Sequence, residues 1–276
     1  MLPKIPIGQW VDVLVVWATD NLTSLFDAIV VVIQFIVGNL TWVLTAPSPW
    51  VIIILSIPLV LFLTNWKTAM GTSLGLLLIY DLRIWEPSMN TLAMVLAATI
   101  VALLVGIPLG ILSARSDNAH KIIMPVLDFM QTMPPFVYLI PAVLFFGTGA
   151  VPGLIATVIF AMPPAIRLTD LGIRQVPLEL VEAAEAFGST QYQKLVKVQL
   201  PVAIPTIMAG INQCIMLALS MVVIAAMIGA GGLGSEVLRG IQRLDIPVGF
   251  EGGLAIVIIA IILDRITQGF GKRGDN

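Results

Sequence analysis

The chain has 276 residues, of which 58% are hydrophobic and only 11% are charged, and its formal net charge at pH 7 is −2. Soluble domains carry about a quarter charged residues, so this composition predicts an integral membrane protein, and the small net charge gives no reason to expect binding to nucleic acid. One cysteine, Cys214, and one histidine, His120, exclude an intramolecular disulfide and argue against a metal centre, so we expect no metal ligands.

Residues 1–48 differ from the rest of the chain. The segment from Trp10 to Trp17 is amphipathic, and the segment from Ser24 to Leu44 is long enough to cross a bilayer but carries polar residues. Both fit helices that lie at the membrane interface with their tryptophans at headgroup level. We therefore expect an N-terminal amphipathic, interfacial segment with the N-terminus outside, and eight spans with the N-terminus inside is the alternative.

Residues 49–276 form the predicted transmembrane domain. Long stretches without charge are divided by proline and glycine into pieces near the length of about 20 residues that a spanning helix needs. Helices are expected because backbone groups in lipid must hydrogen-bond internally. The sequence thus predicts an all-α membrane fold with about seven spans, near residues 50–66, 68–83, 88–113, 122–147, 151–167, 202–228 and 251–270.

The lysines and arginines predict the orientation of these spans. If the polar loop 168–200 is cytoplasmic, ten of the fourteen cations lie inside and four lie outside, which is the bias that the positive-inside rule describes. The four outer cations are then Lys4, Arg83, Arg239 and Arg243.

The loop 168–200 is the longest polar stretch, and its pattern predicts two short helices. Pro177 suits a first helical turn, and Gly188 stands where a helix ends in a left-handed residue. Thr190 and Gln193 form the pattern of a capping box, so a second helix should begin there and stop at Pro201. Alanines on the first helix would let a partner approach closely.

The spacing in this loop resembles the EAA motif of ABC importer permeases. Glu182-Ala183-Ala184 is followed after three residues by Gly188, then after nine residues by Val198, and after one more by Leu200-Pro201. The aliphatic residue before the Leu-Pro pair is Val198, a mild departure from the family's pattern. The strings from Asp128 to Tyr138 (DFMQTMPPFVY), Phe160 to Arg167 (FAMPPAIR) and Asn212 to Met227 (NQCIMLALSMVVIAAM) resemble the permeases of glycine betaine and related osmoprotectant importers.

This resemblance implies a type I ABC importer permease fold and a transport subunit of the bacterial cytoplasmic (inner) membrane. The implied function is ATP-driven import of a quaternary ammonium solute. The implied partners are an ABC ATP-binding subunit, an extracytoplasmic substrate-binding protein and a second permease copy. We expect no cofactor and no enzymatic activity in this chain, because it lacks the P-loop pattern and ATP and Mg²⁺ would bind to the partner. The ATPase-coupling residues implied by the motif are Glu182, Ala183, Ala184, Gly188, Leu200 and Pro201.

Two predicted spans contain candidates for the translocation path. Prolines in one of them would break its helix, which a membrane tolerates where protein or a cavity re-satisfies the backbone, and in the other the polar residues share one helix face. Sparse uncharged polar groups suit a zwitterion that must pass without being held, and ordinary interhelical packing is the alternative. The candidates are Met130, Thr132, Met133 and Tyr138 in the first span and Asn212, Met216 and Ser220 in the second.

Several other residues are expected to have structural roles. His120 is expected to be solvated in a short loop, and Asp264 to be an interfacial anchor. The pairs Gly71/Gly75 and Gly106/Gly110 should favour close helix packing.

The alternatives are an ion-coupled secondary transporter or channel and an ABC permease for another small amine or amino acid. An ion-coupled transporter would predict inverted repeats and intramembrane ionisable residues, and neither is evident in the sequence.

Overall fold

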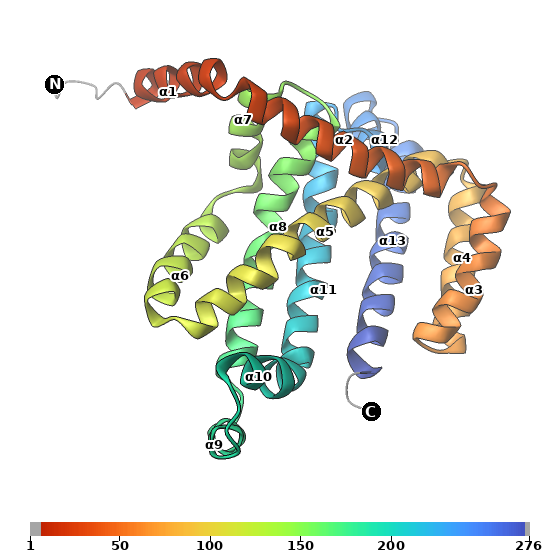
Figure 1. Cartoon of the computed structure of the whole chain (residues 1–276). Coiled ribbons are helices and arrows are strands. Elements are labelled where there is room, and N and C mark those ends of the chain that lie inside the picture. The colour runs from red at the N-terminus through yellow and green to blue at the C-terminus, as the bar shows by residue number, and fades with distance from the viewer. Residues whose placement is uncertain (1–6, 274–276) are drawn as a thin grey trace.

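The computed structural model describes residues 7–273, and in that range the chain is helical from end to end (Figure 1). This confirms the predicted all-α fold. Lys4, which we assign to the outer side, lies outside the described residues. The helices are α1 (Ile7–Asn21), α2 (Thr23–Thr45), α3 (Pro49–Leu63), α4 (Trp66–Asp81), α5 (Trp85–Arg115), α6 (Asp117–Thr132), α7 (Pro135–Phe146), α8 (Ala150–Arg174), α9 (Leu178–Ala186), α10 (Gln191–Lys194), α11 (Leu200–Ala225), α12 (Gly232–Arg243) and α13 (Ile246–Arg273), with a π-helical turn at Leu195–Gln199 and a 3-10 turn at Ala226–Ile228.

Helices α5, α8 and α11 form the centre of the molecule. Figure 1 shows α8, α11 and α13 roughly parallel, with α5 crossing them at an angle. A Cβ added at Gly110 would lie 2.6 Å from the Cβ of Thr169, and one at Gly106 would lie 3.3 Å from the Cβ of Ala165. Because Gly106 and Gly110 have no side chains, α8 approaches α5 closely at these two positions, as predicted.

The second glycine pair, on α4, is only half explained by close packing. A Cβ at Gly75 would lie 2.7 Å from Cγ2 of Ile258, so α4 closely approaches α13 at that point. At Gly71 no atom lies within 4 Å of the added Cβ. The packing prediction is thus confirmed at Gly75 and wrong at Gly71, where the two helices leave a groove.

The number of spans differs from the expected seven. Within the described residues, five helices are long and apolar enough to cross a membrane, or six if the bent pair α6–α7 is counted as one span. The predicted spans 50–66 and 68–83 are the helices α3 and α4, which have only 15 and 16 residues. The count of seven is therefore not confirmed.

The predicted span near 122–147 is not one straight helix. It consists of α6 and α7, which meet at 98°. Met133 between them is extended, with ψ 133°, because the following Pro134 disfavours the helical conformation of the residue before it. Pro134 and Pro135 also lack the N–H groups that would continue the helical ladder.

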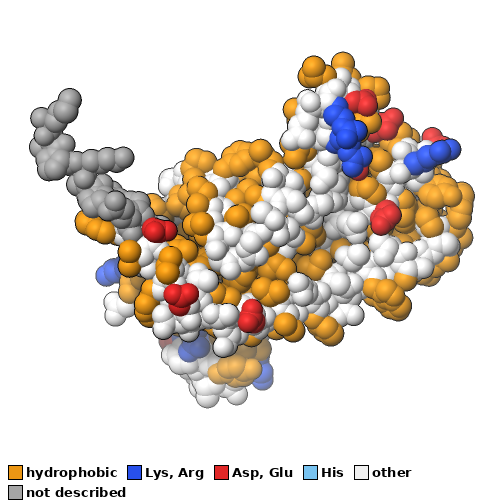
Figure 2. Space-filling model, turned by 90° about the horizontal axis from the view of Figure 1, so that it is seen from above, with side chains coloured by type: hydrophobic (Ala, Val, Ile, Leu, Met, Phe, Trp, Pro, Cys, Tyr) orange, Lys and Arg blue, Asp and Glu red, His pale blue; other side chains and the backbone are white. Residues whose placement is uncertain are grey.

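Helices α1 and α2 run across one end of the bundle, opposite the end that carries α9 (Figure 1). Most of α2 is exposed, and Ile33 is its buried residue against the core. By length and composition α2 could also cross a membrane. Figure 2 looks down on this end and shows hydrophobic side chains spread across the surface among other side chains and backbone, with charged side chains at a few places only.

Large apolar side chains are exposed all around the bundle, which is the reverse of a soluble protein. Phe35 on α2, Ile54 on α3 and Leu104 on α5 are each more than half exposed. Apolar surface of this extent is stable against lipid and unstable against water. The outer surface of the bundle therefore fits a hydrocarbon environment.

Candidate functional site: the coupling loop and the helices it joins

The loop between α8 and α11 turns sharply at Gly188, which has φ +78°. Its N–H donates to the carbonyl of Glu185 at 2.9 Å, and the N–H of Ser189 donates to the carbonyl of Ala184 at 3.0 Å. These two bonds form a Schellman motif, which satisfies carbonyls at the end of α9 and requires a left-handed residue at the position of Gly188. The predicted left-handed helix end is confirmed.

The second half of the loop begins with the predicted capping box. The N–H of Gln193 donates to Oγ1 of Thr190 at 3.3 Å, and the side chain of Gln193 accepts from the N–H of Thr190 at 2.9 Å. The expected stop at Pro201 is wrong, because the backbone stays helical from α10 through the π-helical turn into α11. In the π-helical turn the N–H of Leu200 bonds to the carbonyl of Leu195, five residues back, and the wider turn helps to accommodate the missing donor of Pro201.

The loop packs onto the bundle through a small apolar cluster, and one ion pair holds its two helices together. Ile173 at the end of α8, Leu195 in the π-helical turn and Ala203 on α11 are buried together, and Leu200 packs against them. The ammonium of Lys194 lies 2.5 Å from Oε1 of Glu185. The ion pair thus joins α9 to α10, and the cluster joins the π-helical turn after α10 to the ends of α8 and α11.

The side chains of α9 divide into an inner and an outer set. Ala184 is buried, so it does not contribute to the alanine face that we expected a partner to approach. Glu182 and Ala183 are exposed, and the side chain of Glu182 has no hydrogen bond or ion pair among the described residues. Phe187, which the sequence analysis missed, is 92% exposed at the end of the helix. The sequence feature that could have identified Phe187 was its position directly before Gly188, the glycine of the turn.

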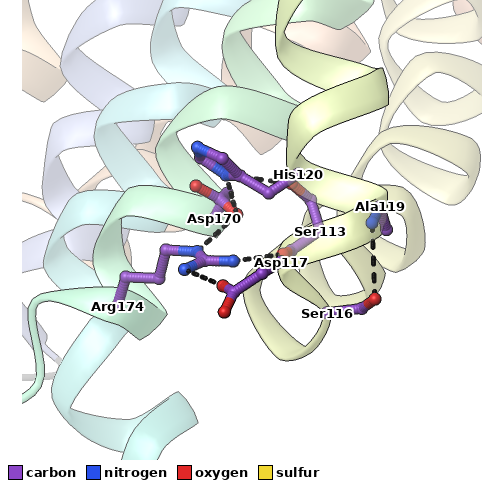
Figure 3. Close-up of polar contacts among 7 residues, drawn as sticks. All are labelled: Ser113, Ser116, Asp117, Ala119, His120, Asp170 and Arg174. Atoms are coloured by element: carbon purple, nitrogen blue, oxygen red, sulfur yellow. Dashed lines mark hydrogen bonds and ion pairs between the residues drawn. The ribbon is translucent and has the colours of Figure 1, made fainter.

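A polar network missed by the sequence analysis ties the end of α8 to α5 and α6 (Figure 3). The guanidinium of Arg174 donates to Oδ1 of Asp170 at 3.2 Å, to Oδ1 of Asp117 at 2.9 Å and to the carbonyl of Ser113 at 2.8 Å. Asp170 is buried, and Nδ1 of His120 lies 3.2 Å from its Oδ1. The expectation that His120 is merely solvated is therefore wrong.

Two residues of this network, Asp170 and Arg174, lie in a segment that we expected to be a loop. Helix α8 continues to Arg174, so the first seven residues of the predicted loop 168–200 are its last two turns. The four-residue spacing of Asp170 and Arg174 was a signal for this, because residues four apart meet on one helix face.

Asp117 gives this network a defined pH range. The hydrogen bond and positive charge of Arg174 lower the pKa of the Asp117 carboxyl. A lowered pKa means that the pair is fully formed above the ordinary aspartate value of about 3.9 and is lost as the pH falls through the lower value in the folded chain. The Asp117 carboxylate is thus charged, and available to pair with Arg174, throughout the physiological range.

The first set of path candidates lies at the bend between α6 and α7. The hydroxyl of Tyr138 on α7 donates to the carbonyl of Met130 on α6, across the bend, and its ring packs at 5.7 Å from that of Phe160 on α8. Thr132 is exposed and Met133 is half-buried at the break itself. Tyr138 thus braces the bend, and the other three lie around it.

The second set lies along α11. Asn212 and Met216 are half-buried and Ser220 is exposed. Nδ2 of Asn212 donates to Oδ1 of Asp264 on α13 at 3.0 Å, while its Oδ1 is buried without a hydrogen-bond partner. Asp264 therefore joins α11 to α13, a contact that the sequence analysis missed, and its role as an interfacial anchor stays a prediction. No hydrogen bond among the described residues links this set to the first, although α7 and α11 touch.

Comparisons with known proteins agree on one family. A model of the family described as "Binding-protein-dependent transport system inner membrane component" matches residues 106–273. The glycine betaine/carnitine transport permease protein GbuB of Listeria monocytogenes is 54% identical over 99% of this chain and 98% of its own length. The glycine betaine transport system permease protein OpuAB of Bacillus subtilis is 52% identical over 97% of this chain and 95% of its own length.

A third relative and a solved structure fit the same picture. The glycine betaine/proline betaine transport system permease protein ProW of Escherichia coli is 48% identical over 97% of this chain and 76% of its own length. An inward-facing structure of the MetNI methionine ABC transporter shares the fold, with a TM-score of 0.61 at 21% identity over 69% of this chain and 95% of that one.

The matched family and the extent of these identities, together with the apolar exposed surface, make the chain a multi-pass protein of the bacterial inner membrane. Its role is that of a transport component and not of an enzyme. The chain belongs to the family of binding-protein-dependent transport system inner membrane components, as an ABC importer permease of the glycine betaine group.

Proposed function

We propose that this permease imports glycine betaine or a related quaternary ammonium osmoprotectant, driven by ATP hydrolysis on a partner subunit. The observation that supports it most is the identity of 54% over nearly the whole length to a permease whose name specifies glycine betaine and carnitine. Two further relatives, named for glycine betaine and for glycine betaine with proline betaine, support the same class of solute.

The ATPase would dock on the outer side of α9. The exposed carboxylate of Glu182 offers a charge to a cation of the partner, and the exposed ring of Phe187 offers an apolar anchor of the kind that dominates interfaces. Ala183 adds a flat, small surface between them. ATP and Mg²⁺ would bind to the ATPase, and this chain would hold no cofactor.

The contacts at the ends of α8 and α11 suggest how ATPase closure would act on the spans. Movement of α9 would pull on the apolar cluster around Leu195 and on Arg174, which holds α5, α6 and α8 together. The central helices would then tilt as a group and expose the path alternately to each side. This motion would reach α11 through its first two residues, Leu200 and Pro201.

Two copies of the chain would form the path between them, with loop 168–200 cytoplasmic and residues 1–48 interfacial on the outer side. The exposed or half-buried candidates Thr132, Met133, Met216 and Ser220 are available for such a shared surface. Their uncharged groups would give weak dipolar contacts to a zwitterion. An extracytoplasmic binding protein would deliver the solute at the end that carries α1, α2 and α12.

Uptake in a reconstituted system tests this proposal. Proteoliposomes would contain the full chain with its partner ATPase and substrate-binding protein, and the measured quantity is import of radiolabelled glycine betaine. We expect import that requires ATP and the binding protein, with glycine, which lacks the quaternary ammonium, failing to compete. Import that follows an ion gradient without ATPase would refute the importer mechanism, whereas ATP-driven import of glycine instead would refute only the solute class.

A further inference from the structure

A groove between α4 and α13 has no role in the transport steps proposed above. Its volume is about 430 Å³, and Ile261 and Ile262 of α13 form its apolar wall. Gly71 on α4 leaves the groove open, because no atom lies within 4 Å of the place where its Cβ would be. On one side of this opening α4 contacts α13, at Gly75 against Ile258, and on the other side the end of α3 contacts α13, at the backbone of Leu63 against Gly269.

Two cations line the same groove without an internal partner. Lys67 lies in the first turn of α4 and Arg265 about two turns before the end of α13. Neither side chain has an ion pair or hydrogen bond among the described residues. At the same end of the molecule Arg167, Arg174 and Lys194 each pair with a carboxylate, whereas Arg115 and Lys121 form no ion pair among the described residues but do not line the groove.

The position of these cations matters because of the membrane. The α3–α4 turn and the end of α13 lie at the end of the bundle that carries α9, which is the cytoplasmic side in the orientation proposed above (Figure 1). A cation on a spanning helix near the headgroup level is stabilised by an anion or by extending to the interface. Basic sites between membrane helices on this side fit anionic lipid headgroups.

We propose that the groove binds one anionic phospholipid of the inner leaflet. The phosphate would lie between the ammonium of Lys67 and the guanidinium of Arg265, and an acyl chain would extend along Ile261 and Ile262 past Gly71. Charge complementarity at the mouth and an apolar wall behind it match the two parts of a phospholipid and not a soluble anion. The bound lipid would join the short α3–α4 hairpin to α13 at the place where α4 and α13 do not touch.

Lipid retention measured by native mass spectrometry tests the site. The full chain would be purified in phosphatidylcholine nanodiscs that contain a minority of phosphatidylglycerol, and retained phosphatidylglycerol would be counted. We expect Lys67→Gln/Arg265→Gln to lower retention on the order of tenfold, because both charge contacts are removed. The matched control Arg115→Gln/Lys121→Gln also removes one arginine and one lysine, both exposed and outside the groove, and should retain lipid like the unaltered chain.

A second variant separates the groove from general surface charge. Gly71→Leu fills the open space without changing any charge and should reduce retention as well, since the acyl chain loses its place. Equal retention in all variants would refute the proposal. A disulfide or crosslink between two copies through Gly71→Cys in native membranes would also refute it, because the groove would then be an interface between permease copies.

Discussion

Gly188 has φ +78° in the turn of the coupling loop, and no atom lies within 4 Å of the place where its Cβ would be. A side chain there would therefore meet no obstacle and would be opposed only by the left-handed backbone, which costs a β-branched residue on the order of 1–2 kcal/mol. We predict that Gly188→Val loosens the turn between α9 and α10 while leaving the bundle folded. Uptake and the ATPase activity stimulated by loaded binding protein should fall together, with expression unchanged.

The matched control for this change is Gly38→Val on α2. It also adds a side chain where no atom lies within 4 Å, but the backbone there is helical, so no left-handed strain arises. If Gly188→Val transports at the rate of Gly38→Val, the turn does not shape the coupling element.

Glu182 is the second residue whose role can be tested alone. Its side chain is exposed and unpaired within the described part of the chain, so Glu182→Lys should not affect folding. We predict that the charge reversal lowers co-purification of the ATPase and lowers uptake at least several-fold, because repulsion replaces attraction to a cation of the partner. Asn118→Lys, which adds a positive charge at an exposed position of the same end, should leave both unchanged. Retained ATPase binding with normal uptake in Glu182→Lys would contradict the docking face.

At the scale of elements, Arg174 makes the largest polar contribution to the packing of α5, α6 and α8. Its three nitrogen atoms each donate to a different partner, which a lysine ammonium at the end of a flexible stem does not reproduce. If Arg174 were replaced by lysine, the buried Asp170 would lose part of its hydrogen bonding, at a cost of about 1–3 kcal/mol. We predict that Arg174→Lys lowers both the melting temperature and the coupling between ATP hydrolysis and uptake.

Arg167→Lys is the control for that prediction. Arg167 pairs with Asp128 across the same pair of helices, at 2.6 Å, but the Asp128 side chain is 65% exposed. Exposed pairs contribute little, about 0–1 kcal/mol, so its loss should shift the melting temperature less. Equal shifts in the two variants would show that the network adds nothing beyond an exposed ion pair.

For the whole molecule, we expect α2 to lie on the membrane and not to cross it. It is long enough to cross, yet it runs across one end of the bundle at a steep angle to α8 and α11 (Figure 1). We predict that single cysteines at Asn21 and at Thr45, the two ends of the α2 region, are both labelled from outside intact cells by an impermeant reagent. A cysteine at Thr190 should be labelled only after the cells are opened.

The chain's own Cys214 is fully buried, so it should not contribute to this labelling. Labelling of Asn21→Cys and Thr45→Cys from opposite sides would make α2 a span and would favour eight spans. Labelling of Thr190→Cys from outside would reverse the orientation and remove the basis for an ATPase docked on α9.

The sequence by itself determined the features that depend on composition or on near neighbours along the chain. The low charge content determined the membrane class, and the Schellman turn at Gly188 and the capping box at Thr190 follow from hydrogen bonds between residues at most five apart. The spacing from Glu182 to Pro201 pointed to the family through its resemblance to the EAA motif of ABC importer permeases. These features need no knowledge of the rest of the fold.

Only the tertiary structure decided the contacts between distant segments. His120 and Asp170 are 50 residues apart in the sequence, and Asn212 and Asp264 are 52 apart, so no local pattern pairs them. Pro134 and Pro135 predicted a break in the helix, but the angle of 98° between α6 and α7 depends on how these helices pack in the fold. Gly71 and Gly75 are a further example, because both are small residues four apart in the sequence. Helix α13 lies against Gly75 but not against Gly71, so close packing occurs at Gly75 and a groove is left at Gly71.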